Sequence, residues 1–200
     1  MRKAVLMVTL CAFAVGVGAQ GAAGQAAPAQ QPPMGPKAEF LRNYNDPADK
    51  ALRLAELVPA DKYGWKPTPD VRSFAAVFLH MTAANFNFMR SLGATLPADV
   101  QIAPGFDTST TDKAKVQALL KQSVEFVRAT VGAMSDEDFA KTIKLPNGTE
   151  RRYNERLFSL ASHTHEHLGQ LIAYTRMAGM VPPWSEEQQR QQQAPPKKSQ

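Results

Sequence analysis

The chain has 200 residues, of which 44% are hydrophobic, and a formal net charge of +5 at pH 7. This length fits one domain with tails, and charges near the two ends supply +3 of the total, so that residues 37–184 carry +2. Because no cluster of lysines and arginines alternates with aromatic residues, the composition argues against nucleic acid as a partner.

The N-terminus has the three parts of a secretory signal peptide. Residues 1–3 (MRK) are basic, residues 4–17 are apolar, and residues 17–19 (VGA) are small or short and precede Gln20. We expect cleavage after Ala19, which makes residues 1–19 the signal and the mature protein periplasmic or secreted. The apolar run is too short to span a bilayer, so we expect no stable membrane insertion after cleavage.

The single cysteine, Cys11, lies inside this signal. A lipoprotein signal has a small residue just before its cysteine, and Leu10 is not small, which disfavours a lipid anchor. Cleavage would leave a mature chain without cysteine. That excludes disulfides, thiolate metal ligands and a cysteine nucleophile.

The mature chain is predicted to begin with a flexible linker at residues 20–36, which are rich in Ala, Gln, Pro and Gly. An apolar spacing typical of a helix begins at Lys37 and ends before Pro59. Asp46-Pro47 has the pattern of an N-cap followed by proline at the first helical position. The first helix therefore either starts at this pair or is kinked there.

Two more helices are predicted in the middle of the chain. Ser73 is a good N-cap for the second helix, and Gly93 is a good glycine for its C-terminal end. The apolar residues that repeat between them are Phe74, Val77, Phe78, Met81, Phe88 and Leu92. Residues 94–109 have the composition of a loop, and residues 111–112 offer a cap for the third helix.

A short hairpin-like turn is predicted at Pro146-Asn147-Gly148, just before the last helix. A fourth helix follows from Tyr153 to Ala178, and Gly179 helps to end it. Residues 185–200 are polar and are predicted to form a disordered tail. Four amphipathic helices with little strand signal predict an all-α fold, an antiparallel four-helix bundle that spans residues 37–184.

Three of the four histidines lie on this last helix. At about 100° per residue, His163 and His167 share one flank of its apolar stripe, whereas His165 lies on the opposite flank and is predicted to be a surface residue. Two imidazoles four residues apart can bind one divalent ion, and a third ligand would complete an open site of the catalytic type. His80, on the second helix, is the candidate. The alternative is that these three are ordinary hydrogen-bonded histidines at the edge of the core.

Other residues near the histidines also have two interpretations. Gln170 and Tyr174 lie on the same flank as His163 and His167, where they can support metal ligands or contact a substrate, although helix packing explains them about as well. Glu166 projects away from this flank and is predicted to be solvated. Gly169 predicts the close approach of a neighbouring helix.

The sequence resembles the DinB/YfiT superfamily of small metal-binding bundles over residues 37–184. The most specific block is HTHEHLGQ at residues 163–170, which runs into YTR and then into GMVPP at residues 179–183. Residues 73–88, with a single histidine in mid-helix, and the turn LPNG at residues 145–148 are weaker signals.

The resemblance implies that three histidines bind a divalent metal ion, and the matching positions here are His80, His163 and His167. Zn²⁺ is favoured, and Ni²⁺ or Fe²⁺ would suit the same ligands. Relatives include thiol-dependent transferases and isomerases, which implies a small-molecule substrate, and they often pair as homodimers. In the family, an arginine commonly follows the second histidine. Leu168 stands at that position here, so the resemblance does not extend to the role of that arginine.

Other familiar motifs are absent from the sequence. A zincin needs HExxH, but Gly169 stands where the second histidine is required, and no ExxH, GxSxG or P-loop occurs. We therefore expect an exported metal-binding protein that hydrolyses a small substrate at a three-histidine site. The alternatives are a thiol-dependent transferase and a non-catalytic, stress-associated metal- or ligand-binding module. No catalytic residue is predicted.

Overall fold

The computed structural model describes residues 34–193, which are mostly helical, as the sequence predicts. The α-helices of this part are α1 (Pro36–Leu57), α2 (Phe74–Ser91), α3 (Lys113–Gly132), α4 (Tyr153–Met177) and α5 (Pro183–Gln193). The shorter elements are the 3-10 helices η1 (Ala60–Lys62), η2 (Phe106–Thr108) and η3 (Glu137–Ala140) and the strands β1 (Thr142–Lys144) and β2 (Glu150–Arg152). The predicted signal peptide, most of the predicted linker and residues 194–200 lie outside the described residues. No helix within residues 34–193 is long and apolar enough to cross a membrane.

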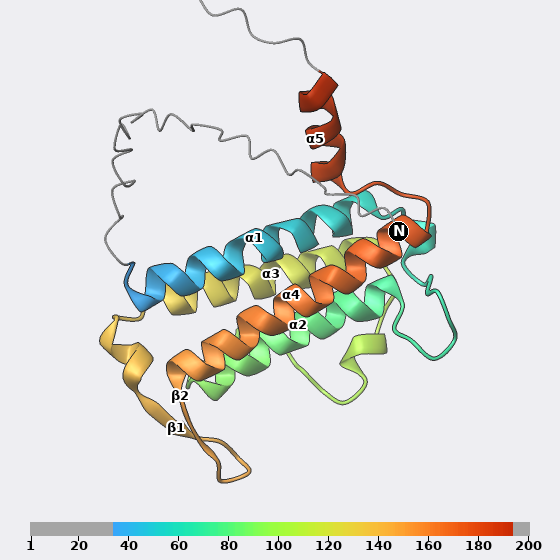
Figure 1. Ribbon diagram of the computed structural model, residues 1–200. Helices are drawn as coiled ribbons and strands as arrows, with labels where there is room; N and C mark the ends of the chain where they lie inside the picture. Colours follow the sequence, from blue (N-terminus) through green and yellow to red (C-terminus); the bar gives the residue numbers. More distant parts are fainter. Residues whose placement is uncertain (1–33, 194–200) are drawn as a thin grey trace, which may run out of the picture. The chain divides into compact units, whose positions relative to one another are not determined.

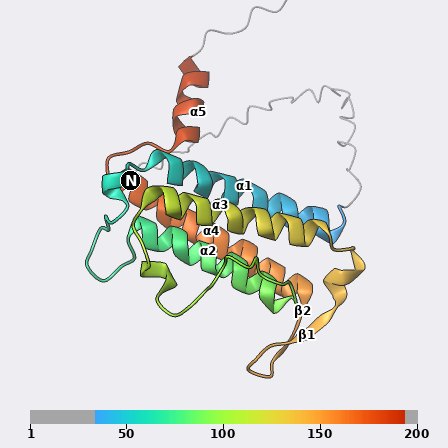
Figure 2. The same ribbon diagram turned by 180° about the vertical axis from the view of Figure 1, so that it is seen from behind.

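The four longest helices lie side by side (Figures 1 and 2). Helix α2 packs against α3 and α4, and α1 packs against the same two helices. Their inward side chains form two groups of buried residues. The larger group includes Leu54, Phe74, Phe78, Leu120 and Leu171. The smaller group includes Tyr44, Met89, Val127, Leu157 and Leu160.

Helix α1 continues through Pro47, which is buried inside it. The interpretation that the helix starts at Asp46-Pro47 is therefore wrong: it begins at Pro36, where the missing N–H of proline has no cost. A proline in a helix interior costs about 3 kcal/mol. Burial of Phe40 and Leu54, which are 6% and 0% exposed, contributes about 1.5–3 kcal/mol for each side chain and offsets this cost.

The predicted caps of α2 and α3 are confirmed. The Ala76 N–H donates to Ser73 Oγ at 3.2 Å, and the Lys115 N–H donates to Asp112 Oδ1 at 2.7 Å. Gly93 follows α2 with a φ of 88°, a left-handed conformation that favours glycine. Both ends of α2 and the start of α3 are thus determined by local sequence.

The predicted hairpin before α4 is also confirmed, because β1 and β2 pair antiparallel. In its turn, Gly148 has a φ of 82° and donates its N–H to Leu145 O at 2.8 Å. The Tyr153 N–H donates to Lys141 O at 2.9 Å. This bond ties the first residue of α4 to the base of the hairpin.

The predicted disordered tail is wrong for residues 185–193, which belong to α5. Pro183 suits the first turn of a helix, and the glutamines and glutamates after it are good helix formers. Helix α5 also contacts α1, since Glu187 pairs with Arg53, and the cationic groups of Lys50 and Arg53 lie 5.8 Å from the ring centroid of Trp184. The prediction of disorder rested on the polar composition of this segment. Composition alone does not show that the segment contacts another helix.

Candidate metal centre

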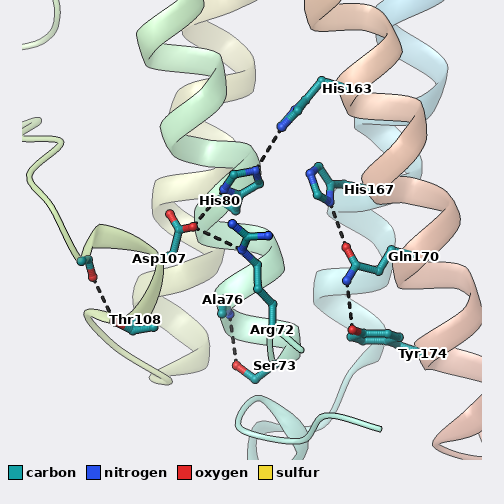
Figure 3. Close-up of polar contacts among 11 residues, drawn as sticks. Arg72, Ser73, Ala76, His80, Asp107, Thr108, His163, His167, Gln170 and Tyr174 are labelled. Atoms are coloured by element: carbon teal, nitrogen blue, oxygen red, sulfur yellow. Dashed lines mark hydrogen bonds and ion pairs between the residues drawn. The ribbon is translucent and has the colours of Figure 1, made fainter. Parts of the chain in front are cut away.

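Three histidines from two helices come together between α2 and α4 (Figure 3). His80, His163 and His167 each offer a ring nitrogen, and these atoms all lie within 4.8 Å of one another. The Nε2 atoms of His80 and His163 are 3.1 Å apart. Among the described residues, these three form the group of histidine, cysteine and acidic side chains that could hold a metal ion.

Helix α4 supplies two of the histidines from one flank. His163 and His167 are about one turn apart, and their ring centroids are 4.4 Å from each other. Ala161, which precedes His163, and Leu168, which follows His167, belong to the two groups of buried residues and hold this part of α4 against the core. His165 is exposed and donates its Nδ1–H to Ala161 O of its own helix at 2.9 Å, so it lies outside the group.

His80, near the middle of α2, is oriented by a residue that the sequence did not indicate. Asp107, in η2, places Oδ2 at 2.9 Å from His80 Nδ1 and at 3.3 Å from Arg72 Nε. A carboxylate that accepts the Nδ1–H of an imidazole fixes the ring and leaves Nε2 as the ligand atom. The Asp107 side chain thus acts on the site through His80.

The position of Asp107 depends on how η2 packs against α2. Gly105 turns the chain with a φ of 82°, and Phe106 packs against the larger group of buried residues. Thr108 Oγ1 donates to Gly105 O at 3.1 Å and closes the turn. None of these contacts has a signature in the composition of the loop, which is why Asp107 was missed.

His167 has an orienting partner on its own helix. Its Nδ1–H donates to Gln170 Oε1 at 2.9 Å, and Gln170 Nε2 donates to Tyr174 Oη at 2.9 Å. Tyr174 also packs edge-on against the rings of Trp65 and Phe74, as the helix-packing interpretation predicts. Ring packing therefore fixes Tyr174, and the hydrogen bond from Gln170 to Tyr174 fixes Gln170. Gln170 in turn orients the His167 ring.

Two residues between these side chains face away from the site. Glu166 is exposed, as predicted. Gly169 is exposed too, and nothing lies within 4 Å of the place where a Cβ would stand, so the predicted close approach of a helix at this glycine is wrong. Gly169 lies one turn after Glu166 on the solvent side of α4, and the wrong prediction came from the residue type, since a glycine in a helix does not by itself indicate a neighbouring helix.

Burial keeps the α4 histidines neutral. Burial, followed by the charges of His167 and His80, lowers the pKa of His163 from 6.5 to about 4. Burial also lowers the pKa of His167, although its hydrogen bond to Gln170 acts in the opposite direction. Because a divalent ion binds the deprotonated imidazole, both side chains are in their ligand form at pH 7.

The donor set fits a divalent ion. Two imidazole nitrogens that bind one Zn²⁺ at about 2.0–2.1 Å each lie roughly 3 to 3.4 Å apart, and the 3.1 Å between His80 and His163 matches this spacing. Three imidazole ligands are typical of catalytic zinc sites, which keep a further position for water or substrate. Here two of the three, His80 and His167, also have hydrogen-bonded outer partners.

Comparison with known proteins identifies the family. A family model described as DinB superfamily matches residues 46–171, more than half of the chain. The chain belongs to the DinB superfamily. The crystal structure of a DinB-like protein from Bacillus cereus is similar to this one, with a TM-score of 0.63 and 17% sequence identity over 73% of this chain and 95% of that chain. No protein of curated function matches the sequence.

Two hollows flank the histidines of this DinB-superfamily protein. One, of about 530 Å³, is lined by His80 and His163 and by residues of α2, η2 and α4. The other, of about 800 Å³, is lined by Gln170 and Arg72 among others. Asp107 lines both hollows, so the carboxylate that orients His80 is also accessible to small molecules.

Proposed function

We propose that this DinB-superfamily protein binds one divalent metal ion through His80, His163 and His167 and is a metal-dependent hydrolase of a small substrate. The observation that carries the proposal is the convergence of three imidazoles, two of which have their Nδ1 atoms tied by Asp107 and Gln170. A bound divalent ion supplies Lewis acidity and lowers the pKa of a coordinated water to about 7. We favour Zn²⁺, and Ni²⁺ or Fe²⁺ would suit the same ligands.

The chain's own residues would position the ligands and shape the substrate pocket. Asp107 holds the His80 ring, and Arg72 holds the Asp107 carboxylate. Because Oδ2 of Asp107 already serves both partners, we assign Asp107 as a positioning residue. The helical scaffold, which we propose to be an antiparallel four-helix bundle, keeps His80 on α2 and the other two histidines on α4 in fixed register.

A thiol-dependent transferase is the second candidate, and the apolar lining of the smaller hollow favours it. Phe88, Ile102 and Phe106 line this hollow beside His80, and they would suit the carbon chain of a thiol or of its acceptor. Residues 20–200 contain no cysteine, so the thiol would be a soluble co-substrate. A non-catalytic, stress-associated metal- or ligand-binding module is the third reading.

Metal analysis combined with an activity screen tests the proposal. Protein purified without a His-tag should carry about one divalent ion per chain, and His80→Ala should carry much less. The metal-loaded protein is then screened on small esters, amides and lactones and on thiol–electrophile pairs. Turnover without thiol that His80→Ala abolishes supports the hydrolase, and turnover that needs a thiol supports the transferase. Bound metal without turnover supports the binding module. Equal, sub-stoichiometric metal in both proteins would contradict the metal site.

We also propose that the protein works in the periplasm or outside the cell, because residues 1–19 have the features of a secretory signal. Its expected partner is a small-molecule substrate, and it would act as a monomer or as a homodimer. N-terminal sequencing from a native-like host should find the chain starting at Gln20. Retention of Met1 in a cytosolic protein would refute export, and sedimentation analysis would give the oligomeric state.

A further inference from the structure

Arg156 lines the same hollow as His80 and His163. It lies on α4 seven residues before His163, a spacing that brings both side chains to the same face, about 10.5 Å apart along the helix axis. Most of the other side chains that line this hollow are apolar, among them Ala83, Ala84, Phe88, Ile102 and Phe106. The hollow therefore combines two of the candidate metal ligands with a cation and an apolar wall, and the one carboxylate in its lining, Asp107, is already paired with Arg72 and His80.

The guanidinium of Arg156 is held in place without being neutralised. Its Cζ lies 4.2 Å from the ring centroid of Phe88, a stacking arrangement that fixes the plane of the group. Its Nε and Nη2 lie 3.4 and 3.3 Å from Ser91 Oγ, and this hydroxyl already donates to Phe88 O. Within residues 34–193, no carboxylate oxygen lies within 4.0 Å of Arg156.

An arginine in this state favours an anionic ligand. Burial, followed by repulsion from Arg151, lowers the pKa of the Arg156 guanidinium, and a bound anion would oppose both effects. The planar guanidinium matches a carboxylate through two parallel hydrogen bonds. A single guanidinium balances one negative charge, so a carboxylate fits this place better than a phosphate dianion.

We propose that Arg156 binds the carboxylate of the substrate, and that the substrate class is a small organic acid whose carboxylate and reacting group are joined by an apolar chain. This inference rests on the proposed function, since the reacting group is the end that reaches the histidines. Phe88 lies between the two groups, because its ring centroid is 4.2 Å from Arg156 Cζ and 6.4 Å from the His163 ring centroid. The acid is therefore longer than acetate, and a chain of roughly five or six carbon atoms suits the helical rise of about 10.5 Å between Arg156 and His163.

The first measurement tests Arg156 in the metal-free protein, by NMR titration with hexanoate and with 1-hexanol. The wild type should bind hexanoate about tenfold more tightly than the alcohol, as one charge-assisted hydrogen-bonded pair allows. Arg156→Met keeps an apolar side chain against Phe88 and should lose this preference, whereas Arg156→Lys should keep part of it. Arg42→Met, which removes an exposed arginine of α1, is the matched control and should behave as the wild type. Equal affinities in the wild type, or a preference that survives in Arg156→Met, would overturn the inference.

The second measurement links this anion site to the metal centre. Co²⁺-loaded protein is titrated with 6-mercaptohexanoate and with 6-mercaptohexan-1-ol, and thiolate-to-cobalt charge-transfer absorption reports sulfur bound to the ion. The acid should reach half of the signal at about a tenth of the alcohol concentration in the wild type, and at the same concentration in Arg156→Met. A band that forms at the same concentration of both thiols would support the metal centre and refute the inference that Arg156 binds the carboxylate. Absence of Co²⁺ binding, with the hexanoate preference intact, leaves Arg156 as an anion site and refutes the proposed function.

Discussion

Helix α4 and the loop at residues 92–112 both build the candidate metal centre, but they contribute to it in different ways. In α4, the two histidines lie one turn apart on a helix whose neighbouring residues are buried in both core groups. The loop contributes Asp107, whose side chain is 29% exposed and is held by Phe106 packing and by an ion pair with Arg72. The helix thus supplies ligands on a rigid frame, whereas the loop supplies the group that orients a ligand.

This difference suggests a division of labour that mutations can test. Changes to the inward flank of α4 should remove the metal, because they delete ligands. Changes to the loop should alter metal affinity and leave the helical fold intact, because exposed ion pairs contribute little to stability.

Loss of a ligand from α4 should have the largest effect. His163→Ala is expected to lower metal affinity by about a hundredfold or more, since loss of an orienting partner alone costs about 10–100-fold. Titration against a competing chelator, with tag-free protein, measures this change. His165→Ala alters the same helix on its exposed side and should bind metal as the wild type does. Similar losses in both variants would show that the inward flank of α4 is not the binding face.

A change in the loop should have the next largest effect. Asp107→Asn is expected to weaken metal binding by about 10–100-fold, because the amide oxygen can still accept the His80 Nδ1–H but brings no negative charge. The metal-free melting temperature should stay close to that of the wild type. Asp99→Asn, in the same loop, alters a carboxylate that accepts from Gln122 Nε2 at 3.0 Å and should leave affinity unchanged. Unfolding of metal-free Asp107→Asn would show that the loop is structural and refute the division of labour.

The two regions also differ in how far the sequence predicted them. The positions of His163 and His167, the exposure of His165 and the hairpin before α4 follow from local geometry, because helical periodicity and a turn motif need only a few neighbouring residues. His80 needed more than periodicity: it was the candidate because it is the only other histidine in the sequence, and the family resemblance then indicated the same position. The prediction for Gly169 failed because it rested on the residue type, whereas the periodicity of α4 places this glycine on the solvent side with Glu166.

The loop could not be predicted because its path is set by residues distant in sequence. Asp107 reaches His80 across 27 positions, after a glycine turn and through the packing of Phe106 on α2. Arg156 was missed for a related reason, because its stacking on Phe88 joins α4 to α2. In both cases the side chain gains its role from a tertiary contact that no local pattern marks.

The orienting partner on α4 allows a direct comparison with the one on the loop. Gln170→Ala should weaken metal binding by about tenfold, at the low end of the range for such partners, because a neutral amide polarises the imidazole of His167 less than a carboxylate would. The same chelator titration is used, with Gln122→Ala as the matched control. A loss larger than that of Asp107→Asn would reverse the proposed order of the two partners.

The buried histidines should also make the metal-free protein sensitive to acid. The pKa of His163 is about 4 in the folded protein, against 6.5 for an exposed histidine such as that of the unfolded chain. Between these two pH values the unfolded chain therefore binds more protons than the folded protein. Stability should therefore fall as pH decreases from 6.5 towards 4. Thermal melts of wild type, His163→Gln and the exposed control His165→Gln measure the effect. The decrease should be smaller in His163→Gln than in the other two proteins, and identical pH profiles for all three would contradict it.

The smallest effects should come from two glycines, one in each region, and they should have opposite signs. Gly105 has a φ of 82° at the start of η2, so Gly105→Ala should destabilise the metal-free protein by about 1 kcal/mol through backbone strain. Gly169 lies within α4 with free space around it, so Gly169→Ala should stabilise the protein by roughly 0.5–1 kcal/mol. Urea denaturation of the metal-free variants measures both changes. Because the turn at Gly105 presents Asp107 to His80, Gly105→Ala should also weaken metal binding, whereas Gly169→Ala should not. A gain in stability at Gly105, or a loss of metal affinity at Gly169, would mean that the loop and the helix do not differ in the way proposed.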